Sequence, residues 1–135
     1  MSISGAAVIS IPPVCMDRWR GKPSIRAVSS SHRSHGVSPT VDDRPVWSVL
    51  CFLVRPGFRR RGVTRALLDG VIGYARYSGA CGLEAYPVDP AGRRIQQSAA
   101  HVGTTTLFEA AGFHRVVQTR ATSDQLPRWL MRMQL

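Results

Sequence analysis

The sequence has few cysteines and no long apolar run. Its cysteines, Cys15, Cys51 and Cys81, are odd in number and lack the spacing of zinc ligands, so neither a disulfide framework nor a metal site is predicted. The apolar stretch from Ile3 to Ile11 follows no basic residue and runs into two prolines, unlike a secretory signal, and no run approaches the length of a membrane span. We therefore expect a cytoplasmic protein in a reducing compartment.

Acidic residues are also scarce, because 8 of them stand against 18 basic residues and leave a formal net charge of +10. All of the basic residues except Lys22 are arginines. A GC-rich genome explains this bias toward arginine as readily as a function does. A basic surface favours polyanionic partners such as nucleic acid, acidic membranes or phosphorylated cofactors, and composition does not choose among them. The length of 135 residues and the 44% of apolar residues fit one globular domain.

The first 44 residues differ in character from the rest. Four prolines interrupt them, and Val28 to Ser38 is mostly Ser, His and Arg without a period of 2 or 3.6. We predict a poorly structured segment over residues 1–44, with a short strand at Ala6 to Ile11, and a folded domain over residues 45–135.

The folded part begins with a strand and a helix. The β-branched and aromatic run from Val46 to Val54 is apolar on both faces, which indicates a central strand. After an arginine-rich loop, residues Val63 to Tyr77 carry one apolar stripe at helical spacing and end at Ser78 and Gly79.

The remaining elements alternate in the same way. We expect a buried strand at Cys81 to Tyr86, a polar excursion at Val88 to Ser98, and a helix at Gly103 to Ala111 followed by Gly112 in a left-handed turn. Two further strands are predicted at Phe113 to Thr119 and Arg128 to Met133. This order predicts an α/β fold whose first β-α-β unit is a right-handed parallel crossover.

The loop between the first strand and the first helix has the chemistry of an anion site. A helix N-terminus leaves backbone N–H groups unpaired and carries roughly half a positive charge. Gly62 lets a ligand approach the backbone, and Arg59, Arg60, Arg61 and Arg65 add charge, which suits a pyrophosphate. A solvated loop in an arginine-rich protein explains the same residues, and local physics leaves both interpretations open.

Two motifs in this chain resemble those of the GCN5-related N-acetyltransferases (GNAT). The segment RRRGVT, residues 59–64, matches the R/Q-x-x-G-x-G/A signature, and GTTTLFEAAGF, residues 103–113, is similar to a later helix of the family that ends in Gly-Phe. The resemblance implies a partial GNAT-like mixed sheet around a β-α-β cofactor-binding unit. It also implies transfer of an acetyl group from acetyl-CoA to a primary amine of a small molecule or peptide.

The same resemblance implies roles for individual residues. The strand before the loop pairs with the pantetheine arm, a backbone N–H near Leu53 or Val54 polarises the thioester carbonyl, and the loop amides hold the pyrophosphate. Glu84 is the first candidate for the general base and Asp89 the second, although Glu84 can equally be a paired structural carboxylate. The expected cofactor-binding residues are Phe52, Leu53, Val54, Arg59, Arg60, Arg61, Gly62, Val63, Thr64 and Phe108.

Several positions depart from the family pattern. Thr64 stands where Gly or Ala is usual, and Phe108 replaces the tyrosine that serves many members as general acid, so we expect Phe108 to fill the core. His101 stands where many relatives have asparagine, and a lone histidine there is more often a surface or capping residue than a catalyst.

The family's elements before the cofactor strand have no counterpart in residues 1–40, which leads us to expect that the N-terminal strands are absent or disordered. The chain would then be a truncated or frame-shifted product, or a degenerate relative, and a sheet begun at Val46 would expose an edge through which a homodimer could form. The rival hypothesis is a small basic module that binds nucleic acid or another polyanion, although we expect neither nucleic acid nor membrane as the main partner.

Overall fold

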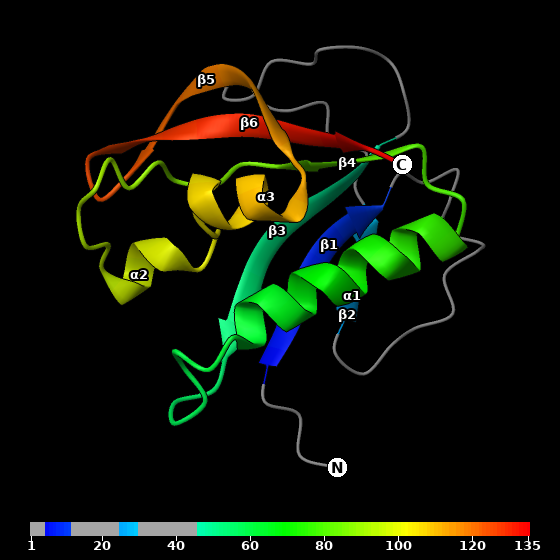
Figure 1. Ribbon diagram of the computed structural model, residues 1–135, viewed down its shortest axis with the longest axis horizontal. Helices are drawn as coiled ribbons and strands as arrows, with labels where there is room; N and C mark the ends of the chain where they lie inside the picture. The colour runs from blue at the N-terminus through cyan, green and yellow to red at the C-terminus, as the bar shows by residue number, and fades with distance from the viewer. Residues whose placement is uncertain (1–4, 12–24, 30–45) are drawn as a thin grey trace.

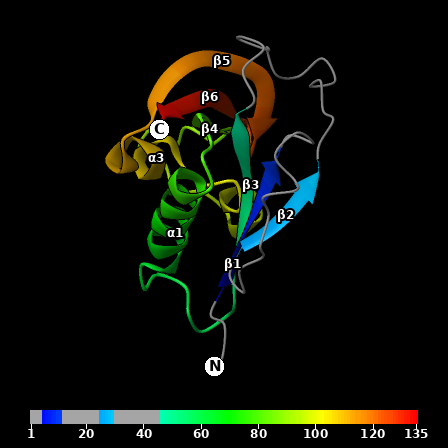
Figure 2. The same cartoon turned by 90° about the vertical axis from the view of Figure 1, so that its right-hand side faces the viewer.

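The computed structural model describes residues 5–11, 25–29 and 46–135 of the chain. One mixed sheet runs through all three ranges, in the order β2-β1-β3-β4-β6-β5 (Figure 1). Helices α1 and α3 lie on the same side of this sheet (Figure 2). The elements are β1 (Gly5–Ile11), β2 (Ile25–Ser29), β3 (Trp47–Val54), α1 (Val63–Tyr77), β4 (Gly82–Ala85), α2 (Gln97–Ala100), α3 (Thr105–Ala111), β5 (His114–Ser123) and β6 (Leu126–Gln134).

The predicted α/β class and its β-α-β unit are confirmed. Strands β3 and β4 are parallel and are joined by α1, whose bounds are those that the apolar stripe predicted. The stripe turns toward the sheet, so that Leu68, Val71 and Ala75 are fully buried. Burying a side chain of the size of leucine stabilises the fold by about 2 kcal/mol, so this face of α1 contributes several kcal/mol to folding.

The N-terminal part of the chain corrects one expectation. The short strand predicted at Ala6 to Ile11 is confirmed as β1, but β2 was not expected, and N-terminal strands are therefore present in the described residues. β1 runs antiparallel to β3 and parallel to β2, so the edge of β3 that was expected to be exposed is paired. The pattern missed β2 because its partner β1 is not adjacent to it in sequence. The rest of the segment predicted to be poorly structured, residues 1–4, 12–24 and 30–44, lies outside the described residues.

Short-range signals explain the remaining elements. The Thr104 side chain accepts a hydrogen bond of 3.2 Å from the Leu107 N–H and thereby caps α3, and Gly112 ends this helix with φ of 105° as predicted. Strands β5 and β6 form a hairpin whose two turn residues, Asp124 and Gln125, both have positive φ. The single-turn helix α2 was not predicted, and it begins at the end of the segment that was predicted as a polar excursion.

Candidate functional site

Strand β3 continues for five residues beyond its last pair with β4. β3 and β4 pair from Trp47 with Leu83 to Val49 with Ala85, and β1 skips one residue of β3 between its partners Val49 and Cys51. A β-bulge of this kind bends the strand and breaks the pairing. The end of β3 that leads to the arginine-rich loop therefore turns away from β4.

A pocket of about 810 Å³ lies at this separated end of β3. Its volume falls within the range of about 300–1,000 Å³ that is usual for sites of small molecules and cofactors. The pocket reaches from the loop before α1 to the segment after α2, and β1 and α3 also contribute to it. The lining residues are Gly5, Ala6, Phe52, Leu53, Val54, Arg55, Phe58, Arg59, Arg60, Gly62, Val63, Thr64, Arg65, Ala100, His101 and Leu107.

The pocket includes almost the whole set of cofactor-binding residues expected from the sequence. Phe52 to Val54 come from β3, and the loop and first turn of α1 contribute the others. Two expected residues, Arg61 and Phe108, are not in the lining. Residues far apart in the chain, such as Ala6 and His101, are in it, and no local pattern could have indicated them.

One end of the pocket is the N-terminus of α1. Gly62 is the N-cap residue with φ of 76° and ψ of 12°, a left-handed conformation that glycine adopts without strain. Among the described residues no side chain caps this end, and the first turn contains no acidic residue. The first backbone N–H groups of α1 therefore face the pocket with the positive end of the helix dipole.

Arginines surround this end. Arg55, Arg59, Arg60 and Arg65 line the pocket, and its lining includes no acidic residue. Arg65 is held in place by Asp69, at 3.2 Å, and by the backbone oxygen of Ala110, at 3.3 Å. A cluster of this kind attracts phosphate groups, and fixed guanidinium groups pair well with them.

Arg61 is not in the pocket lining, and its guanidinium lies 5.8 Å from the centre of the Phe58 ring. This cation–π contact orders the loop without adding to the pocket lining.

Backbone groups of β3 form one wall of the pocket. The Phe52 N–H donates a hydrogen bond of 2.7 Å to the His101 carbonyl oxygen, which places this N–H on the side of the pocket. Because backbone groups alternate along a strand, the Val54 N–H points to the same side and the Leu53 N–H points toward β1. Of the two amides expected to polarise a carbonyl, the one at Val54 has the suitable direction. Leu53 contributes its side chain, which is 53% exposed.

Phe108 lies in the hydrophobic core. Its ring is fully buried, 4.9 Å from the Phe113 ring centre in an edge-to-face arrangement and 6.1 Å from that of Phe52. This placement matches the expectation that Phe108 fills the core, and through Phe52 it supports the pocket wall.

The proposed general base lies outside the pocket lining. Glu84 on β4 is 8% exposed, its Oε1 is paired closely with Arg132, and its Oε2 accepts a hydrogen bond of 3.0 Å from the Tyr86 hydroxyl. These contacts favour the interpretation of Glu84 as a paired structural carboxylate, while its role as a base stays a prediction.

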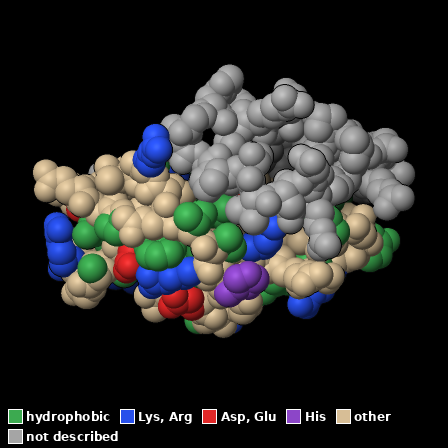
Figure 3. Space-filling view, turned by 90° about the horizontal axis from the view of Figure 1, so that it is seen from above, with side chains coloured by type: hydrophobic (Ala, Val, Ile, Leu, Met, Phe, Trp, Pro, Cys, Tyr) green, Lys and Arg blue, Asp and Glu red, His purple; other side chains and the backbone are tan. Residues whose placement is uncertain are grey.

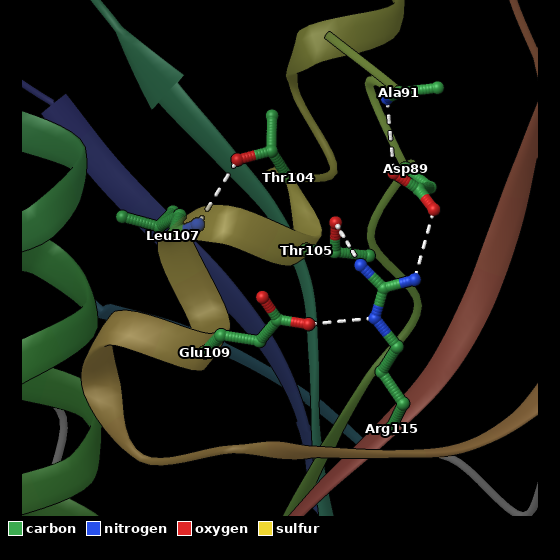
Figure 4. A network of polar contacts seen from close by, with 7 residues as sticks. All are labelled: Asp89, Ala91, Thr104, Thr105, Leu107, Glu109 and Arg115. Atoms are coloured by element: carbon green, nitrogen blue, oxygen red, sulfur yellow. Dashed lines mark hydrogen bonds and ion pairs between the residues drawn. The ribbon is translucent and has the colours of Figure 1, made fainter.

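Asp89, the second candidate base, belongs to a network around Arg115 (Figure 4). Arg115 reaches Asp89 at 2.9 Å, Glu109 at 2.7 Å and the Thr105 hydroxyl at 3.3 Å, so it ties β5 to α3 and to the segment after β4. The Ala91 N–H first, and then Arg115, hold the pKa of Asp89 below its usual range. Asp89 is therefore a poor proton acceptor at neutral pH.

Neither of the two described cysteines shows signs of a reactive centre. Burial raises the pKa of the Cys51 thiol, which keeps it protonated, and Cys81 is exposed. Among the described residues no group of His, Cys, Asp and Glu could hold a metal ion. None of the helices in the described ranges is long and apolar enough to cross a membrane.

Comparison with known proteins identifies the fold. A chain of the NatC complex bound to Gag peptide and CoA is similar with a TM-score of 0.53 and 17% identity, covering 73% of this chain and 57% of that one. A putative acetyltransferase of the GNAT family from Desulfovibrio desulfuricans gives 0.50 and 22%, covering 72% and 57%. The mosquito protein arylalkylamine N-acetyltransferase like 5b gives 0.50 and 12%, covering 67% and 43%.

These similarities show that the chain has the fold of the GNAT acetyltransferases, which confirms the resemblance at the level of the fold. The chain spans only 43 to 57% of the length of these three structures. The sequence itself matches no protein family and no curated protein significantly.

Proposed function

We propose that the chain binds acetyl-CoA in the pocket beside β3 and transfers the acetyl group to an amine. One observation carries this proposal. Residues 52–54 and 59–64, expected from the sequence to hold the cofactor, line one pocket together except for Arg61. That pocket ends at an uncapped helix N-terminus with four arginines around it. The donor set suits a ligand with a pyrophosphate at one end and an extended arm.

Different residues of the pocket bind different parts of the ligand. The amides of Val63 and Thr64 hold the pyrophosphate, and Arg59 and Arg60 add charge at the rim. The arm lies along β3, where the Val54 N–H donates to a carbonyl oxygen of the ligand and stabilises the negative charge that develops on it. The bound cofactor supplies an acyl group activated as a thioester.

The acceptor is an amine of a small molecule or peptide that reaches the pocket from the separated ends of β3 and β4. We retain Glu84 as the base to be tested, in the variant Glu84→Gln. If Glu84 is structural, this variant loses stability because Arg132 keeps only part of its partner, and its pH–rate profile keeps the shape of the parent's. If Glu84 is the base, the alkaline-side activity falls while cofactor affinity stays unchanged.

Location and assembly belong to the proposal as well. We expect a reducing, cytoplasmic compartment, because the three cysteines of the sequence are odd in number and lack the spacing of a disulfide framework. A homodimer through a sheet edge stays a prediction, and its surface would be β2 or β5, which are the outer strands of the described sheet.

Isothermal titration calorimetry with coenzyme A, acetyl-CoA and pantetheine tests the proposal. Coenzyme A and acetyl-CoA should bind with similar affinity, and pantetheine should bind far more weakly because it lacks the pyrophosphate. Both ligands should also raise the melting temperature, because they bind only the folded state. Equal affinity for pantetheine contradicts the site.

The rival function, a polyanion-binding module, predicts the opposite pattern. RNA would then bind with an affinity that falls steeply with salt, and coenzyme A would not raise the melting temperature. The distribution of charge on the surface supports polyanion binding less than the net charge does. On the face seen in Figure 3, acidic side chains lie between the basic ones and interrupt the basic surface.

A further inference from the structure

Strand β4 ends beside an arginine of β6, at the point where β3 turns away. Tyr86 directly follows β4 and is the first residue beyond the last pair of β4 with β3. Its carbonyl oxygen accepts a hydrogen bond of 2.8 Å from the Nε–H of Arg128. This contact places the guanidinium group of Arg128 against the end of β4.

The Tyr86 carbonyl faces the gap between β4 and the far end of β3. The neighbouring Pro87 oxygen accepts a hydrogen bond of 3.0 Å from the Trp129 N–H of β6, and the Val88 N–H donates one of 3.1 Å to the segment before α3. Successive backbone groups of an extended chain point to opposite sides, so the Tyr86 oxygen points away from β6. The guanidinium of Arg128 therefore lies at the gap that opens where β3 leaves β4.

The backbone of Arg128 is fixed on both sides. Arg128 forms a bridge with Val88, and its carbonyl oxygen accepts a hydrogen bond of 2.9 Å from the Thr119 hydroxyl. Arg128 is partly buried and lies outside the lining of the cofactor pocket. A guanidinium group has five N–H donors, and the bond to Tyr86 uses the one on Nε. The two Nη groups are left for a ligand.

Arg128 has no carboxylate partner among the described residues. Four of the five carboxylates in these ranges are paired with other arginines: Asp69 with Arg65, Glu84 with Arg132, and both Asp89 and Glu109 with Arg115. The fifth, Asp124, lies in the turn between β5 and β6. Burial lowers the pKa of Arg128, although a guanidinium group keeps its proton at every physiological pH. A partly buried cation of this kind gains from binding an anion that comes from outside.

The surroundings of the gap are positive on both sides. Four arginines and no acidic residue line the cofactor pocket, and Arg128 adds a positive charge at the end of β4. An acceptor amine arrives at neutral pH as an ammonium ion. A second positive group on the acceptor would be repelled here, whereas a negative group would be attracted and bound.

We propose that the acceptor carries a carboxylate or phosphate group besides its amine, and that the Nη groups of Arg128 bind this anionic group. The assignment rests on the proposed function, because it takes the gap between β3 and β4 as the entry path of the acceptor. With its anionic group at the end of β4, the acceptor directs its amine toward β3, along which the cofactor arm lies.

Binding of small amines to the full chain saturated with coenzyme A tests this assignment. β-Alanine is compared with propylamine, and O-phosphoethanolamine with ethanolamine. All four carry an ammonium group at neutral pH, each pair differs mainly in the anionic group, and the two pairs distinguish carboxylate from phosphate. Spermidine is the polycationic probe. Nuclear magnetic resonance follows the titrations, with the Nε–H signal of Arg128 as the reporter.

At least one anionic amine should bind about tenfold more tightly than its matched amine and move the Arg128 Nε–H signal. Spermidine should bind no more tightly than propylamine. In Arg128→Gln the preference for the anionic amine should fall below about twofold, and Arg128→Lys should keep part of it because the charge remains. Arg76→Gln is the matched control, since it removes an equal charge from an exposed position in the last turn of α1. It should keep the parent's preference.

Loss of the fold is distinguished from loss of the anion site by the affinity for coenzyme A, which should change less than about threefold in all three variants. A merely structural role of Arg128 would weaken both members of a probe pair equally and leave their ratio unchanged. If Arg128→Gln does not fold, the ratio in Arg128→Lys and the Nε–H signal of the parent decide.

Two results overturn the inference, and they are distinguishable. If coenzyme A binds the parent but neither anionic amine binds more tightly than its matched amine, or folded Arg128→Gln keeps the preference, Arg128 does not select the acceptor. The proposed function then survives without this assignment. If coenzyme A gives no binding heat with the folded parent, the proposed function fails and the assignment of Arg128 fails with it.

Discussion

Replacing Gly62 by valine separates the cost of a strained backbone from the loss of a binding site. Gly62 has φ of 76°, and a Cβ added there meets no atom of the described residues within 4 Å. The substitution therefore causes no clash within that part of the protein. Its structural cost is the left-handed conformation itself, about 1–2 kcal/mol for a residue with a side chain.

The effect on binding should be larger. Gly62 lines the pocket at the N-terminus of α1, so a valine side chain fills the space through which a pyrophosphate reaches the amides of Val63 and Thr64. Two charge-assisted hydrogen bonds at about 1.5 kcal/mol each amount to about 3 kcal/mol. A loss of this size weakens coenzyme A binding by about 100-fold.

Gly57 provides a matched control in the same loop. It also has a left-handed φ, 89°, it is exposed, and an added Cβ meets no described atom within 4 Å, but it does not line the pocket. Gly57→Val should therefore lose as much stability as Gly62→Val and keep the affinity for coenzyme A. Thermal melting and calorimetric titration of both variants decide the matter. The reasoning is refuted if Gly62→Val binds as tightly as Gly57→Val, because the loop is then only a basic turn.

Three further predictions concern charge, packing and pH. Arg60→Ala should weaken coenzyme A binding by no more than about fivefold in the same titration, since an exposed charge contributes at most about 1 kcal/mol. Gly103→Ala should lower the free energy of unfolding by about 2 kcal/mol or more in urea denaturation, because the new Cβ would lie 2.6 Å from the Phe108 ring at a φ of 82°. Arg115→Gln should cost about 1 kcal/mol at pH 7, a figure reduced because the side chain is 34% exposed. The pKa of Asp89 is lowered in the fold, so its stabilising contribution is present above about pH 4 and is lost as the pH falls further. The difference in melting temperature between the parent and Arg115→Gln should therefore narrow below about pH 4.

Local patterns predicted the elements that depend on neighbouring residues. The apolar stripe from Val63 to Tyr77 predicted the bounds of α1, and Gly112 predicted the end of α3. Both predictions were possible because helix periodicity and a left-handed cap depend on residues that are close together in the chain. β2 was not predicted, since its only described partner is β1, which is not adjacent to it in sequence. The five residues from Ile25 to Ser29 show no period long enough to indicate a strand without that partner.

The same distinction holds for the candidate site. The loop over residues 59–64 could be predicted because glycine, arginines and a helix start follow one another in the chain. The other end of the pocket could not, because the contact between the Phe52 N–H and the His101 carbonyl depends on the separation of β3 from β4. The sequence could not show that Glu84 is paired, because its partner Arg132 is 48 positions away. The two residues become neighbours only through the pairing of β4 with β6.

The central claim is that backbone amides at the start of α1 hold the pyrophosphate of coenzyme A. Amide nuclear magnetic resonance during titration with coenzyme A tests it most directly. The largest shift changes should fall on the N–H groups of Gly62, Val63 and Thr64, followed by Val54, and pantetheine alone should leave the first three unchanged. Shift changes confined to arginine side chains, with these amides unmoved at saturating coenzyme A, would contradict the account.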